Sequence, residues 1–155
     1  MDKDLIYMKE ALKEALKAQN KDEVPVGCVV VHKDKIIARA HNQVETLKDP
    51  TAHAEMIAIT QAAASLGSKW LQDAVVYVTI EPCLMCAGAL VLARIKELVF
   101  GAKDPKTGAC GSVLNIPKQK PLNHTFKVTS GVLEADCSFL ISEFFKKKRN
   151  YANPA

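Results

Sequence analysis

Apolar side chains recur at helical spacing near the start of the chain. Within residues 5–18 they alternate with lysine and glutamate and stand at Leu5, Met8, Leu12 and Leu16. A spacing of three or four residues places these side chains on one face of a helix. The pattern therefore predicts an amphipathic helix that packs against the rest of the protein.

The spacing then changes to that of extended structure. Residues 26–31 form a nearly unbroken run that favours β-structure, residues 32–35 are polar, and residues 36–40 are again mostly apolar. Two such runs around a short polar segment predict a β-hairpin.

Helical and extended segments alternate along the remainder of the chain. We expect helices at residues 52–65, 83–93 and 133–148, strands at residues 74–80, 97–100 and 125–129, and a long surface loop over residues 101–120. Pro82 supports the helix that follows it, because proline suits the first turn of a helix. A hairpin followed by alternating helices and strands predicts an α/β domain with a mixed five-stranded sheet.

The composition is that of one globular domain covering residues 1–155. Hydrophobic residues make up 48% of the chain and charged residues 25%. The longest apolar run, residues 87–93, is far too short to cross a bilayer, so we expect no membrane contact. The first residues mix both charges and lack the pattern of a secretory signal. Because five cysteines also form an odd set, we expect a cytoplasmic protein whose close cysteine pair binds metal or does redox work.

The net charge of +4 permits a polyanionic partner without requiring one. The clearest basic run follows two aromatic residues near the C-terminus, and the segment reads Phe144, Phe145, Lys146, Lys147, Lys148 and Arg149. One interpretation is a solvated helix end. The other is an RNA-binding surface, in which the aromatic rings pack and the cations contact phosphates.

Two short motifs carry the candidate chemistry: His53 with Glu55, and Cys83 with Cys86. One imidazole and two thiolates would hold zinc and leave its fourth tetrahedral position open for water, which is typical of catalytic sites. Cys83 and Cys86 share a helix face, whereas His53 and Glu55 can converge only at a helix end. The metal should therefore lie over the N-terminal ends of two helices, where the thiolates are favoured. A fourth anionic ligand would make zinc a poorer activator of water, so Glu55 is better used as a base.

The pattern His-x-Glu followed by Pro-Cys-x-x-Cys is the signature of zinc-dependent nucleobase deaminases. Sequence around both motifs, at residues 49–56 and 76–89, resembles the bacterial tRNA-specific adenosine deaminases within the cytidine and deoxycytidylate deaminase family. Similar segments recur at residues 23–27, 99–102, 106–108, 122–124 and 144–146, so the resemblance extends over almost the whole chain.

This resemblance implies a three-layer α/β/α cytidine-deaminase-like fold, one zinc ion per chain and a homodimer. It implies that the partner is a tRNA anticodon stem-loop, in which adenosine becomes inosine at the first anticodon position. In such proteins a zinc-activated hydroxide attacks C6 of adenine while the glutamate, here Glu55, moves the protons. Carried over by position, Asn42 would recognise the base, Val26 and His53 would sandwich the purine, and Ala54 would line the pocket.

Two alternative functions stay open. A deaminase of free guanine, cytidine or another small nucleoside would use the same metal chemistry, but would not need the aromatic and basic C-terminal segment. A noncatalytic zinc-bound module that interacts with RNA would need a closed metal site with a fourth protein ligand. No cysteine or histidine stands at a matching position for that ligand.

Overall fold

A mixed five-stranded sheet forms the centre of the computed structural model, which describes residues 2–152. The strands are β1 (Gly27–His32), β2 (Lys35–His41), β3 (Ala74–Ile80), β4 (Glu97–Ala102) and β5 (Lys127–Ser130), arranged in the order β2-β1-β3-β4-β5. β1 pairs antiparallel with both β2 and β3, whereas β3, β4 and β5 run parallel to one another. The predicted mixed five-stranded sheet is confirmed.

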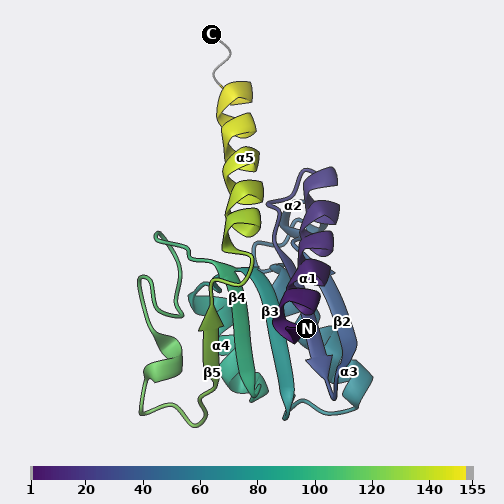
Figure 1. Ribbon diagram of the computed structural model, residues 1–155, viewed down its shortest axis with the longest axis vertical. Coiled ribbons are helices and arrows are strands. Elements are labelled where there is room, and N and C mark those ends of the chain that lie inside the picture. The colour runs from purple at the N-terminus through teal and green to yellow at the C-terminus, as the bar shows by residue number, and fades with distance from the viewer. Residues whose placement is uncertain (1, 153–155) are drawn as a thin grey trace.

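Helices cover both faces of the sheet, so the fold has three layers (Figure 1). The helices α3 (Ala54–Leu66) and α4 (Leu84–Ala93) pack on one face, and α1 (Lys3–Asn20) and α5 (Glu134–Ala152) pack on the other. Side chains of β1 contribute to a core on each face of the sheet. Val30 belongs to the core under α3 and α4, and Val29 belongs to the core under α1 and α5. Because β1 is covered on both faces, its sequence is continuously apolar and does not alternate.

Close approach of α1 to the sheet depends on Gly27, the first residue of β1. A Cβ atom at this position would lie 1.9 Å from the carbonyl oxygen of Ala11 in α1. At its other end, β1 turns into β2 through Lys33 and Asp34, which have φ angles of 50° and 63°. Positive φ at both central residues gives a turn whose twist matches that of a hairpin.

Element boundaries differ from the predicted ones mainly at helix ends. The helix expected at residues 52–65 begins at Ala54, because His53 keeps an extended backbone with φ −75° and ψ 152° and acts as the N-cap. The last helix continues to Ala152, four residues past its predicted end. Two short helices were not predicted, α2 (Val44–Leu47) and the 3-10 helix η1 (Ile116–Lys118).

The sheet and its helices bring several chain segments together at one end. β3 ends at Ile80, and α4 begins four residues later, so the N-terminus of α4 lies at the carboxyl end of the parallel strands. This is the end at which α/β sheets commonly bind ligands. Within residues 2–152, no helix is both long enough and apolar enough to span a bilayer.

Candidate active site

The N-termini of α3 and α4 bring the three predicted metal ligands together. His53 and Cys83 are the N-cap residues of these helices, and both have extended backbones that turn their side chains out of the helix. Cys86 lies in the first turn of α4. The Nδ1 atom of His53 is 3.6 Å from the sulfur of Cys83 and 3.5 Å from that of Cys86. The structure thus places the three side chains as the motif spacing predicted.

This cluster fits a zinc ion by its donors and by its dimensions. The ligand atoms of His53, Cys83 and Cys86 all lie within 4.8 Å of one another, so one ion can reach all three. A hydrogen bond from Cys86, reinforced by His53, lowers the pKa of the Cys83 thiol to about 4. The same hydrogen bond raises the pKa of the Cys86 thiol, so before any ion binds the thiolate is favoured at Cys83 only. One nitrogen and two sulfur ligands make the set that the deaminase pattern uses.

Glu55 stands beside the cluster, in the first turn of α3, and is not one of its three ligands. Its side chain is 3% exposed. Burial raises the pKa of its carboxyl group to about 7, although the imidazole of His53 opposes the shift. A group that exchanges its proton near neutral pH is suited to general acid and base catalysis.

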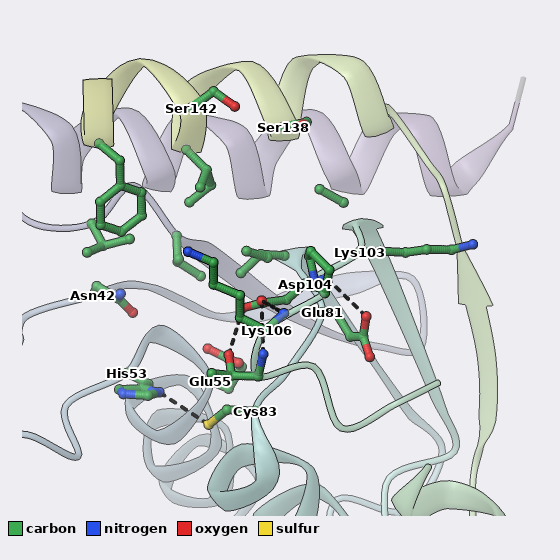
Figure 2. A pocket seen from close by; sticks show the side chains of 18 of the residues that line it. Asn42, His53, Glu55, Glu81, Cys83, Lys103, Asp104, Lys106, Ser138 and Ser142 are labelled. Carbon is green, nitrogen blue, oxygen red and sulfur yellow. Dashed lines mark hydrogen bonds between the residues drawn. The ribbon is translucent and has the colours of Figure 1, made fainter. Parts of the chain in front are cut away.

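A pocket of about 640 Å³ opens over the cluster, and its floor includes His53, Glu55 and Cys83 (Figure 2). Its volume is in the range of sites that bind small organic ligands. Val26 and Asn42, to which the resemblance assigns contacts with the base, are among the residues that line it.

Hydrogen bonding fixes the orientation of the Asn42 amide. The oxygen Oδ1 of Asn42 accepts a hydrogen bond of 2.8 Å from the backbone N–H of Ala54. The NH2 group, which only donates, is then the group that Asn42 can offer to a ligand. Ala54 itself is fully buried, and its backbone serves to hold Asn42.

Comparisons with known proteins agree with this geometry. Residues 1–102 match the zinc-binding region of the cytidine and deoxycytidylate deaminases. The tRNA-specific adenosine deaminase of Bacillus subtilis is 51% identical over 149 residues, which cover 96% of this chain and 92% of that protein. The tRNA-specific adenosine deaminase of Aquifex aeolicus is 52% identical over 144 residues, which cover 93% of this chain and 95% of that protein.

The chain belongs to the cytidine and deoxycytidylate deaminase family.

Solved structures of two kinds of deaminase resemble this one. A deaminase that edits adenosine to inosine at the wobble position of transfer RNA superposes with a TM-score of 0.85 at 43% identity, covering 87% of this chain and 98% of the other. A guanine deaminase from Nitrosomonas europaea superposes with a TM-score of 0.72 at 26% identity, covering 88% and 81%. The cytidine-deaminase-like fold predicted from the resemblance is confirmed.

Residues 144–149 of α5 differ in whether they line the pocket of this deaminase. Phe145 and Arg149 line it, whereas Phe144 is largely buried and meets the Phe145 ring edge-on at a centroid distance of 5.4 Å. Lys148 forms an ion pair of 2.7 Å with Asp22. The remaining two cations of the segment, Lys146 and Lys147, are exposed.

One wall of the pocket is not predicted by the sequence. Six consecutive residues line it, namely Ala102, Lys103, Asp104, Pro105, Lys106 and Thr107. The side chain of Asp104 accepts hydrogen bonds from the N–H groups of Lys106 and Thr107, which makes a tight turn. Asp-Pro ahead of a glycine is a recognisable turn signal. That signal locates the turn, but the sequence does not tell which part of the molecule the turn faces.

Proposed function

We propose that this deaminase converts adenosine to inosine at the first anticodon position of tRNA. The supporting observation is the pocket in which His53, Cys83 and Cys86 form a three-ligand cluster beside the buried Glu55. The tRNA-specific relatives align with 96% and 93% of this chain. The guanine deaminase is less similar in both sequence and structure.

His53, Cys83 and Cys86 would hold the zinc ion, with Glu55 left free for proton transfer. Bound zinc would act as a Lewis acid and lower the pKa of a water molecule to about 7. Glu55 accepts a proton from the attacking water, passes it to the ring nitrogen N1, and delivers the next proton to the departing amine. A C–O bond forms at C6, the C–N bond breaks, and water is consumed as ammonia leaves.

The pocket walls would orient the base for this reaction. Val26 and His53 both line the pocket, and in this proposal they contact the two faces of the purine. The NH2 group of Asn42, fixed by the bond from Ala54, would donate to an acceptor nitrogen of the ring. Holding the base in one orientation is worth several orders of magnitude in rate.

An anticodon hairpin is the substrate that tests this proposal. Adenosine in the loop of a short stem-loop should be converted to inosine, because unpaired loop bases can enter the pocket without the full cost of opening a duplex. Free adenosine, cytidine and guanine should react much more slowly. Mass analysis of the hairpin measures the gain of about one dalton when an amine becomes a carbonyl. Faster turnover of free guanine than of the hairpin would instead assign a guanine deaminase.

We further propose that the C-terminal segment contacts the RNA. Arg149 and Phe145 already face the pocket, and Lys146 and Lys147 are exposed beyond it. Phe144 would support the ring of Phe145 from below through their edge-on contact. Lys148 would contribute to the same positive surface, although its pairing with Asp22 reduces the charge available to a phosphate.

Removal of the four cations from this segment should weaken tRNA binding and its dependence on salt. With Lys146, Lys147, Lys148 and Arg149 changed to alanine, the slope of log affinity against log salt should become shallower by roughly 0.7 to 0.9 for each phosphate that no longer meets a cation. Titration of a labelled hairpin at several salt concentrations measures this slope. The matched control changes four exposed lysines at the opposite end of the sheet, Lys33, Lys35, Lys69 and Lys96. An equal effect in both variants would mean that only net charge matters.

We also propose a homodimer formed through the outer face of α4. Leu84 and Leu92 are 56% and 79% exposed on this face, and Gly88 lies between them with open space at its Cβ position. Exposed apolar residues in a contiguous patch are typical of association surfaces. Sedimentation of a Leu92→Asp variant, which places a charge in that patch, measures the contribution of this face.

A cytoplasmic location fits the proposed tRNA substrate. All five cysteines are free, and the proposed zinc ligands need Cys83 and Cys86 as reduced thiolates.

A further inference from the structure

Glu81 is a buried carboxylate that the proposed reaction does not use. It follows the last residue of β3, precedes Pro82, and is 2% exposed. Its oxygen Oε1 accepts hydrogen bonds from the N–H of Asp104, at 3.1 Å, and from the hydroxyl of Ser112. Its oxygen Oε2 accepts from the N–H groups of Cys110 and Ser112, each at 3.0 Å. Four donors from one loop therefore converge on a single side chain.

The same loop supplies the pocket wall at residues 103–107. Gly108 closes the turn by donating from its N–H to the carbonyl of Asp104 at 2.9 Å. A Cβ atom on Gly108 would lie 2.4 Å from the carboxyl group of Glu81, so the chain passes directly over this carboxylate. The N–H of Ala109 donates to the carbonyl of Pro82 at 2.9 Å, which ties the loop to the segment that carries Cys83.

Figure 2 shows what this wall presents to the pocket. The side chain of Lys106 extends over the pocket, whereas that of Lys103 points away from it. Lys106 lies in the turn that Asp104 closes, and the N–H of Asp104 donates to Glu81. Hydrogen bonds thus connect the backbone of Lys106 to Glu81 through Asp104.

We propose that Glu81 is a positioning residue that holds the turn at residues 104–108 in place, so that Lys106 meets a phosphate of the RNA substrate. This inference rests on the proposed function and adds a residue that acts through another. Although Glu81 lines the pocket, both of its carboxylate oxygens accept hydrogen bonds from this loop, so it acts through the turn. Its contribution is to make the wall rigid before the substrate binds, which lowers the entropy cost of binding.

A carboxylate suits this role because all four of its partners are donors. Glutamine has almost the same shape, but one of its two terminal atoms is an NH2 group that only donates. At the Oε1 position, that group would face the N–H of Asp104; at the Oε2 position, it would face the N–H groups of Cys110 and Ser112. Either orientation removes at least one anchor of the loop and leaves a donor unpaired.

The test is hairpin kinetics of Glu81→Gln in the zinc-loaded protein. KM for the anticodon hairpin should rise about tenfold, as expected for the loss of a hydrogen bond to a charged group, while kcat should stay within about threefold. The salt slope of hairpin binding should become shallower by roughly 0.7 to 0.9, as it should in Lys106→Ala. The double variant should bind the hairpin no more weakly than whichever single variant binds it less tightly, because both changes remove the same interaction.

Two further variants make the outcome decisive. Glu97→Gln is the matched control, because Glu97 lies at the opposite end of the sheet, where it accepts a hydrogen bond from Thr129, and it should leave KM and the salt slope unchanged. Ser112→Ala removes one donor and keeps Glu81, so it should raise KM by about twofold to fivefold even if Glu81→Gln does not fold.

Three results would overturn the proposal. Parental KM and salt slope in both Glu81→Gln and Ser112→Ala would mean that Glu81 stabilises the fold only. Loss of zinc from Glu81→Gln would place its role at the metal cluster. Additive effects of the Glu81 and Lys106 changes would mean that the two residues act independently. Failure of the proposed function is seen separately, as absence of inosine when the parental protein acts on the hairpin.

Discussion

Glu55→Gln should abolish deamination while zinc content and fold stay close to those of the parental protein. Glutamine fills nearly the same buried volume but cannot carry a proton between the attacking water, the ring nitrogen and the leaving amine. A positioned general acid and base contributes roughly 10² to 10⁴ in rate, so kcat on the anticodon hairpin should fall by at least about 10². Single-turnover conversion of the hairpin measures this loss directly.

The structure makes this result specific to proton transfer. Glu55 is 3% exposed and lies beside the metal cluster, but its carboxylate is not among the three ligand atoms. Metal analysis of Glu55→Gln should therefore still give one zinc per chain, and hairpin affinity should stay near the parental value. Glu97→Gln, the same change at the far end of the sheet, should keep full activity. Loss of zinc in Glu55→Gln would show that Glu55 is a ligand, and residual activity within about tenfold would contradict its catalytic role.

The parts of the site that the sequence predicted are those encoded locally. Cys83 and Cys86 share a helix turn, and His53 stands two residues before Glu55, so short motifs were enough to assign them. The convergence of the two motifs followed from helix geometry, because residues two apart cannot share a mid-helix face. In the structure both motifs do lie at helix ends, since His53 and Cys83 are the N-cap residues of α3 and α4.

Long-range contacts account for what the sequence did not predict. The helix α2 has only four residues, too few for a helical period, and it depends on Glu23, about twenty residues earlier in the chain. The carboxylate of Glu23 accepts from the N–H of Glu45 at 3.0 Å and of Thr46 at 2.6 Å. Glu81 organises the pocket wall in the same way from a comparable distance. No periodic pattern marks either glutamate, because their partners lie far away along the chain.

Removal of one metal ligand should weaken zinc binding and abolish activity, whereas the change at Glu55 should abolish activity alone. Cys86 is fully buried in the first turn of α4 and supplies one of the two sulfur ligands. Replacement by alanine leaves one imidazole and one thiolate, which is fewer than the three protein ligands of catalytic zinc sites. Changes to residues that merely support zinc ligands cost about 10- to 100-fold in metal affinity, so loss of a ligand should cost more.

In Cys86→Ala we therefore expect substoichiometric zinc after dialysis and loss of hairpin deamination, both measured on the same preparation. Cys137→Ala is the matched control, since Cys137 is also a buried cysteine but belongs to the core between α1, α5 and the sheet. It should keep one zinc per chain and parental activity. The two variants separate the ligand role of a thiolate from the packing role of a buried cysteine. If Cys86→Ala retains one tightly bound zinc and full activity, the cluster at the helix N-termini is not the catalytic metal site, and the assignment of Glu55 fails with it.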